Sequence, residues 1–265
     1  MFRKRRLSLI GLYFSGTGNT RYCVETFLKE YDADARSFSI EEEQASRHVK
    51  EQEEIVFGYS VQYSNIPKMV QDYIADNSDV WQGKKVFVIA TMGMFSGDGA
   101  GMLARLLAKH GAVILGGLHL KMPDSICDVK VLKKTLPENQ RLVKKAEQKT
   151  KIAANRLKSG NPTREGLGIA SRLAGLLGQR LYFYHMTRKY SDKLKINADK
   201  CIGCGKCVDL CPMKNIYIEN GKAAAGSRCT MCYRCINNCP VQAVTLLGKS
   251  VIVQGGIEKY LQVKE

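Results

Sequence analysis

Eight of the ten cysteines fall into two copies of one spacing near the C-terminus, and this spacing indicates the chemistry. Each copy reads C-x2-C-x2-C-x3-C-P, a run typical of [4Fe–4S] ligation. Soft thiolates of this kind favour iron–sulfur clusters or zinc. Zinc sites usually use C-x2-C pairs separated by a longer spacer, and disulfides are rare in reducing compartments. The spacing therefore predicts two [4Fe–4S] clusters bound by Cys201, Cys204, Cys207, Cys211, Cys229, Cys232, Cys235 and Cys239.

The duplicated run resembles that of two-cluster bacterial ferredoxins, in which the fourth cysteine of each run binds the other cluster. This resemblance implies that one cluster is bound by Cys201, Cys204, Cys207 and Cys239. It implies that the other cluster is bound by Cys211, Cys229, Cys232 and Cys235. Between the runs, the pair Asn220-Gly221 follows an apolar segment and predicts a β-hairpin.

A second chemical signal lies near the N-terminus, where a strand-like segment, residues 7–14, runs into a loop rich in glycine and hydroxyl side chains. Apolar residues at helical spacing follow from Cys23 onward. A strand–loop–helix unit presents backbone N–H groups and a helix N-terminus to a phosphate. The lysine of a P-loop is missing, and Arg21 stands where a dinucleotide motif has its third glycine. The alternative is an ordinary strand–helix turn. As a mononucleotide phosphate site, the loop comprises Ser15, Gly16, Thr17, Gly18, Asn19 and Thr20.

Further apolar runs indicate the fold around this loop. Residues 55–59, 86–90 and 112–115 are compact apolar segments separated by helical stretches. This alternation predicts an α/β fold with a doubly wound parallel sheet. Ligands bind such sheets beyond the carboxyl ends of the strands. The rule points to loop 15–20 and to the loops at 60–67 and 91–99.

The loop Ser15–Thr20 is similar to the FMN-phosphate loop of flavodoxins, S/T-x-T-G-N-T, at every specified position. The whole chain resembles bacterial flavodoxin–ferredoxin fusion proteins, over residues 5–155 and 195–248. The resemblance implies a flavodoxin-like doubly wound parallel sheet plus a small α+β two-cluster ferredoxin domain. It also implies FMN, with its phosphate on loop 15–20 and its ring between the other two loops. The further cofactor-binding residues so implied are Tyr63, Ser64, Asn65, Thr91, Met92, Gly93, Met94, Phe95 and Asp98.

Two of these residues carry alternatives. Tyr63 is the candidate to stack on the flavin, because Trp81 lies outside the implied loops. It is otherwise an ordinary loop aromatic. Asp98, between two glycines, either binds a ribityl hydroxyl or forms a turn. No catalytic residue is indicated.

The expected organisation has four parts: a flavodoxin-like FMN domain (1–160), a basic helical connector (161–194), the ferredoxin-type domain (195–248) and a C-terminal extension (249–265). The net charge of +16 is concentrated between residues 130 and 195. This charge favours docking of an acidic redox partner over solvated lysines alone, and no nucleic-acid module is present. The connector is expected to be a helix between the domains, with a helix lying on an anionic membrane as the alternative.

Other features of the sequence bear on where in the cell the protein is expected. No segment has the length of apolar sequence that spans a bilayer. The basic start and short apolar run imitate a signal peptide, but no small-residue cleavage site follows, so a buried strand is expected. The use of cysteine as a metal ligand predicts a reducing, cytoplasmic location.

The two cofactors together predict the function. Iron–sulfur clusters carry single electrons, whereas a flavin accepts one or two and can pass a hydride. We therefore expect an oxidoreductase that takes electrons from a low-potential redox protein or reductase, passes them between the clusters and FMN, and reduces a small-molecule acceptor. The alternative is an electron-transfer adaptor between protein partners with no organic substrate. A redox sensor is a third hypothesis, without an output domain to support it.

Overall fold

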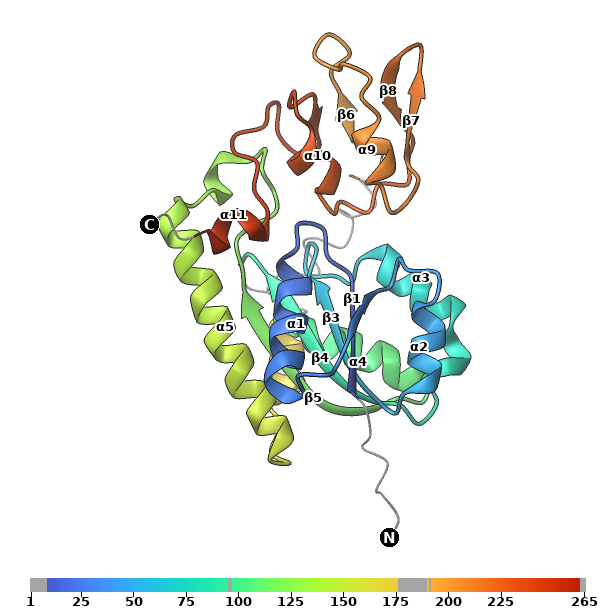
Figure 1. Cartoon of the computed structure of the whole chain (residues 1–265), viewed down its shortest axis with the longest axis vertical. Helices are drawn as coiled ribbons and strands as arrows, with labels where there is room; N and C mark the ends of the chain where they lie inside the picture. The colour runs from blue at the N-terminus through green and yellow to red at the C-terminus, as the bar shows by residue number, and fades with distance from the viewer. Residues whose placement is uncertain (1–8, 95–96, 176–189, 191, 263–265) are drawn as a thin grey trace.

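The computed structural model describes residues 9–94, 97–175, 190 and 192–262. Within these residues a five-stranded parallel sheet has the strand order β2-β1-β3-β4-β5 (Figure 1). This is the doubly wound order of flavodoxin-like folds, so the predicted fold class is confirmed. The strands are β1 (Leu9–Tyr13), β2 (Ser37–Ser39), β3 (Glu54–Ser60), β4 (Lys85–Met92) and β5 (Val113–Lys121).

Helices cover both faces of this sheet, which is why its central strands are apolar on both sides. One face packs against α1 (Asn19–Tyr31) and α5 (Leu136–Lys158), and the core between them contains Phe27, Phe87 and Val143. The other face packs against α2 (Ala45–Glu51), α3 (Lys68–Asp76), the 3-10 turn η1 (Ser78–Trp81) and α4 (Gly99–Lys109). Helix α5 begins with a capping box between Thr135 and Glu138.

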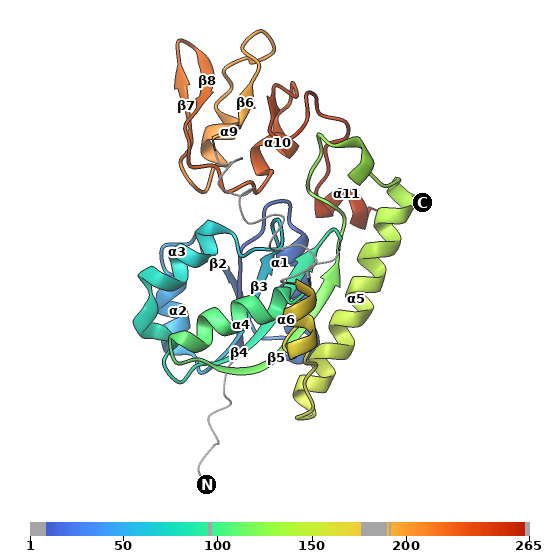
Figure 2. The same ribbon diagram turned by 180° about the vertical axis from the view of Figure 1, so that it is seen from behind.

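The edge of the sheet at β5 is covered by the start of the expected connector. Gly117 donates its N–H to the carbonyl of Thr163 at 2.8 Å, and Glu165 donates to the carbonyl of Gly117 at 2.9 Å. The short helix α6 (Ile169–Gly175) follows on the face of the sheet that carries α4, as the reverse view shows (Figure 2). Most of the expected connector helix, from residue 176 to 189, lies outside the described residues.

The C-terminal part is small and built around the cysteine runs. Its two antiparallel pairs are β6 (Lys195–Ile196) with β9 (Val244–Thr245), and β7 (Ile216–Glu219) with β8 (Lys222–Ala225). Asn220 and Gly221 join the second pair with φ of 49° and 73°, so the predicted hairpin is confirmed. Short helices α9 (Lys206–Asp209) and α10 (Arg234–Asn238) follow the second cysteine of each run.

The two parts of the chain are packed together at the carboxyl ends of the sheet strands (Figure 1). The core of the C-terminal part includes Cys127, which is fully buried, and is extended by Tyr63 and Ile126 from the N-terminal part. The extension after residue 248 returns to the N-terminal part, where α11 (Ile257–Leu261) lies against α5. No helix within the described ranges combines the length and apolar character needed to cross a bilayer.

Candidate functional site

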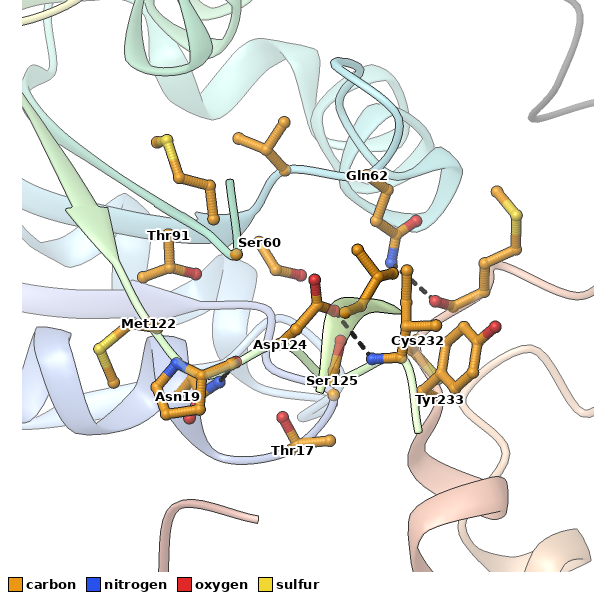
Figure 3. Close-up of a pocket in the computed structure, with 18 of the residues that line it drawn as sticks. Thr17, Asn19, Ser60, Gln62, Thr91, Met122, Asp124, Ser125, Cys232 and Tyr233 are labelled. Atoms are coloured by element: carbon orange, nitrogen blue, oxygen red, sulfur yellow. Dashed lines mark hydrogen bonds between the residues drawn. The ribbon is translucent and has the colours of Figure 1, made fainter. Parts of the chain in front are cut away.

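A cavity of about 370 Å³ lies where the carboxyl ends of β1, β3 and β4 meet the C-terminal part. Its volume is within the range of small-molecule and cofactor sites. Figure 3 shows Thr17 and Asn19 on one side of this cavity and Cys232 and Tyr233 on another. The predicted cofactor residues that line it are Ser15, Gly16, Thr17, Asn19, Thr20, Tyr63, Ser64, Thr91, Met92, Gly93 and Met94.

The loop before α1 is built to receive an anion. Gly18 takes the left-handed conformation, with φ of 86°, and no side chain among the described residues caps the helix start. The N–H groups of the first helical turn therefore remain available to a ligand. Ser15 Oγ and Asn19 Oδ1 are buried and have no hydrogen-bond partner among the described residues. Buried polar atoms are rarely left without partners. The Ser15 hydroxyl can donate to a bound phosphate, whereas Asn19 Oδ1 can only accept a hydrogen bond from a donor group of a ligand or from water.

Two side-chain hydrogen bonds connect this loop to the ends of neighbouring strands. Thr20 Oγ1 and Thr91 Oγ1 lie 2.8 Å apart and join the loop to the end of β4. Asn19 Nδ2 donates to the carbonyl of Pro123 at 2.8 Å. The amide nitrogen of Asn19 is thus used by the protein, whereas its buried oxygen can still accept a hydrogen bond from a ligand or water.

The loop after β3 brings Tyr63 to the cavity through a tight turn. Gln62 and Asn65 exchange both backbone hydrogen bonds, and Tyr63 and Ser64 between them have φ of 46° and 57°. The ring of Tyr63 stacks on that of Tyr190, with centroids 6.0 Å apart and planes inclined by 11°. One aromatic neighbour of Tyr63 is therefore a residue of the connector. Asn65 closes the turn and does not line the cavity.

Three other predicted residues lie elsewhere. Asp98 is fully buried at the start of α4, where its carboxylate pairs with Arg105, so its role there is structural and the ribityl interpretation is not supported. Gly18 lies on the outer side of the phosphate loop, against Ile257. Phe95 lies outside the described residues.

The segment after β5, which the sequence placed near the flavin edge without naming its residues as cofactor-binding, supplies Met122, Pro123, Asp124, Ser125 and Ile126 to the cavity. The Oδ1 atom of Asp124 accepts the N–H of Ile126 at 2.9 Å, and Oδ2 lies against Gly93. Burial raises the pKa of the Asp124 carboxyl. The rule that ligands bind beyond strand ends would have indicated this segment, had the end of β5 been placed at residue 121.

The cysteines surround two small cavities in the C-terminal part. One is lined by Cys201, Cys204, Cys207 and Cys239. The other is lined by Cys211, Cys229, Cys232 and Cys235. These are the two groups that the ferredoxin resemblance implies. Among the described side chains, no three His, Cys, Asp or Glu are arranged to hold a single metal ion; a cubane cluster is instead bound at its corners by separated thiolates.

Backbone N–H groups point at several of these sulfur atoms. Cys211 Sγ accepts from Asn215 and Cys239 Sγ accepts from Ala243, both at 3.3 Å and both four residues ahead. The repeat of this bond in both runs reflects their duplication. Such N–H···S bonds stabilise anionic sulfur and tune cluster potentials. Similar bonds reach Cys201 from Ala223 at 3.4 Å and Cys229 from Met231 at 3.3 Å.

The second group of cysteines lies directly against the phosphate loop. Cys232 lines the large cavity as well as its own cysteine cavity. Gly16 packs so closely on the carbonyl of Cys232 that a methyl group at Gly16 would lie 2.1 Å from the oxygen. Burial raises the pKa of the Cys232 thiol to about 12, so binding a cluster there must displace a proton.

Comparison with known proteins agrees with this geometry. Residues 10–114 match the flavodoxin domain family, and residues 193–240 match the 4Fe-4S dicluster domain family. The chain thus combines a flavodoxin domain with a 4Fe-4S dicluster domain. The chain belongs to the proteins that fuse a flavodoxin domain to a ferredoxin domain.

Individual relatives cover only parts of the chain. Ferredoxin-2 of Desulfomicrobium norvegicum is 57% identical over 28 residues, which are 11% of this chain and 48% of the relative. The chain thus spans about half the length of that ferredoxin. A ferredoxin of Pyrococcus woesei is 70% identical over 20 residues, 8% of this chain and 95% of the relative. The structure of a flavodoxin from the domain Archaea is similar at 17% identity, covering 57% of this chain and 99% of the flavodoxin, with a TM-score of 0.41.

Proposed function

We propose that this protein is an FMN- and iron–sulfur-dependent oxidoreductase. Electrons from a low-potential redox protein pass through two [4Fe–4S] clusters to FMN, which reduces a small molecule. The observation that carries this proposal is the position of Cys232, which lines both the cavity at the phosphate loop and a four-cysteine cavity. A flavin in the first and a cluster in the second would be neighbours.

The flavin is held by the protein's own loops in this proposal. The N–H groups at the start of α1, together with Ser15, Thr17 and Asn19, bind the phosphate. The fit is supported by the buried hydroxyl group of Ser15, which has no hydrogen-bond partner among the described residues. When bound, FMN exchanges single electrons with a cluster and two electrons with an organic acceptor. The apolar wall of Met92, Met122 and other side chains excludes water from its ring.

The two clusters have different places in the relay. The group of Cys211, Cys229, Cys232 and Cys235 adjoins the flavin cavity and takes the inner cluster. The group of Cys201, Cys204, Cys207 and Cys239 takes the outer cluster. Cys204 is exposed, and its neighbour Ile202 is 62% exposed, which supports electron input at this end of the chain.

The C-terminal part of the chain covers one side of the proposed flavin cavity, and this favours a small molecule over a second protein as the electron acceptor. Met231, Cys232, Tyr233 and Leu247 of the C-terminal part form one wall of the cavity. A protein partner is thereby kept from this side of the flavin site. In this proposal a small molecule approaches beside residues 91–94, where the Met94 side chain is 61% exposed.

Anaerobic rapid mixing of the reconstituted protein with reduced methyl viologen tests the proposal. Absorbance should report reduction of the clusters before reduction of the flavin. The variant Cys229→Ser, checked for folding by circular dichroism and for iron content, should lose the fast flavin phase because the inner cluster is damaged. Equal flavin reduction rates in this variant and the wild type would contradict the relay. A second experiment addresses the acceptor. The reduced wild-type protein is screened for reoxidation by quinones, nitro compounds and disulfides, and an acidic ferredoxin is included to test a protein acceptor.

A further inference from the structure

The two cysteine runs differ between their second and third cysteines. The first run has Gly205-Lys206 at this place, and the second has Tyr233-Arg234. The backbone is the same in both runs, because Gly205 and Tyr233 each take the left-handed conformation with φ of 75° and 60°. This conformation favours glycine and is unfavourable for residues with a side chain. Tyrosine at this position therefore needs a compensating interaction.

The hydroxyl group of Tyr233 supplies such an interaction across the domain boundary. It donates to Asp128 Oδ1 at 3.0 Å, and Asp128 belongs to the segment after β5. The other carboxylate oxygen accepts the N–H groups of Leu246 and Leu247 at 2.8 and 3.0 Å. Asp128 is 4% exposed, so water does not replace these bonds readily. One carboxylate of the flavodoxin domain thus holds two separate segments of the ferredoxin domain.

The side chain of Arg234 reaches a different part of the flavodoxin domain. Its two terminal nitrogens donate to the two carboxylate oxygens of Glu41 at 2.7 and 2.5 Å. One of them also donates to the carbonyl of Ser15 in the phosphate loop at 2.9 Å. The two charged side chains are only 18% and 21% exposed. A bidentate, largely buried pair is stronger and more directional than an exposed ion pair.

The first run shows what this place looks like without such contacts. Lys206 is exposed, and it has no ion pair or side-chain hydrogen bond among the described residues. A methyl group added to Gly205 would meet no atom within 4 Å. The same loop geometry is therefore compatible with an open surface, and cluster ligation alone does not require Tyr233 and Arg234.

We propose that Tyr233 and Arg234 are positioning residues that clamp the inner cluster onto the flavin site. Both lie between two cysteines of that cluster, Cys232 and Cys235, so any movement of the clamp moves the cluster ligands. Their partners Asp128 and Glu41 lie on opposite sides of the sheet order, after β5 and after β2. Contacts at both sides fix the tilt of the ferredoxin domain as well as its distance. The proposal rests on the relay from cluster to flavin proposed above.

The test compares Arg234→Gln, Arg234→Lys and Tyr233→Phe with the matched control Lys206→Gln, which makes the corresponding change in the first run. Iron and sulfide content and FMN content establish that each variant is loaded. Rapid mixing with reduced methyl viologen then gives the rates of cluster and flavin reduction. Arg234→Gln should slow flavin reduction about tenfold or more and leave cluster reduction unchanged. Arg234→Lys, which keeps the charge, should recover part of the rate, and Lys206→Gln should match the wild type.

Hydrogen–deuterium exchange provides a readout that does not depend on electron flow. Arg234→Gln and Tyr233→Phe should each speed exchange of amides in 15–20 and 229–235, where the domains meet, without faster exchange in the β1 and β3 strands. Unchanged exchange and unchanged flavin reduction in these variants would overturn the clamp, as would an equal effect of Lys206→Gln. If the wild-type flavin is not reduced through the clusters but exchange responds as described, the relay fails and the clamp stands as an interdomain contact.

Discussion

The contact between Gly16 and the carbonyl of Cys232 gives a quantitative test of how closely the two domains meet. In the variant Gly16→Ala, the added carbon would lie 2.1 Å from the carbonyl oxygen and 3.1 Å from the carbonyl carbon of Cys232. Both neighbours are backbone atoms, so no flexible side chain can turn away and the loops must separate. Forcing an extra methyl group into a packed site costs about 1–3 kcal/mol. Since 1.4 kcal/mol is a factor of ten in an equilibrium constant, the closed arrangement should be weakened about five- to 150-fold.

Urea unfolding of the loaded protein measures this loss as a lower transition midpoint, and rapid mixing should show slower flavin reduction at unchanged cluster reduction. Gly168→Ala is the matched control, because a methyl group at Gly168 meets no atom within 4 Å. Equal midpoints and equal flavin rates for the two variants would refute the reasoning. The two loops would then not be in contact in the folded protein.

Three further outcomes are expected. Ser15→Ala should weaken FMN binding about tenfold or more in calorimetry, because hydrogen bonds to charged groups contribute roughly 1.5–3 kcal/mol; an unchanged affinity would remove Ser15 from the phosphate site. The reconstituted wild type should hold about eight iron atoms, and Cys211→Ala should lose the cluster of 229–235 and not that of 201–207; electron paramagnetic resonance of the reduced protein distinguishes the two, and the reverse loss would refute the crossed ligand sets. Because burial raises the pKa of Asp124 above 3.8, ionisation of this carboxyl costs stability. The stability advantage of Asp124→Asn over the wild type in urea should therefore be absent well below pH 3.8, grow as the pH rises from 3.8 to the raised pKa, and stay constant above it; a constant difference at all pH values would contradict this.

Much of the architecture could be predicted from local patterns. The strand, loop and helix around residues 9–31 follow from an apolar run, a hydroxyl-rich turn and helical spacing, and the hairpin at Asn220-Gly221 follows from turn chemistry. These signals are local because the backbone conformation of a few residues decides them. The short strand Ser37–Ser39 was missed, since an edge strand with two serines lacks the apolar pattern of a buried one.

The remainder of the site depends on contacts between distant segments. The extent of β5 is obscured by Gly116, Gly117 and His119, which interrupt its apolar run, so the residues after it were not predicted to bind the cofactor. The place of Asp98 after β4 is typical of a ligand-binding residue. Its carboxylate instead pairs with Arg105, which belongs to the helix that begins directly after Asp98. The local sequence around Cys232 does not indicate that this residue lines the cavity at the phosphate loop. The only related feature of the sequence is that the second cysteine run has Tyr233-Arg234 where the first has Gly205-Lys206.

The core of the C-terminal part contains a residue of the N-terminal part, and this affects how the protein unfolds. Cys127, at 0% exposure, is buried among ferredoxin residues, although it belongs to the segment that follows the flavodoxin sheet. Its backbone carbonyl also accepts the N–H of Ile252, and the extension beyond reaches Thr17 through Ile257. Neither part can therefore close its apolar interior alone, and the two should melt in one cooperative transition instead of two. Global unfolding of either part would then release the flavin and the clusters together.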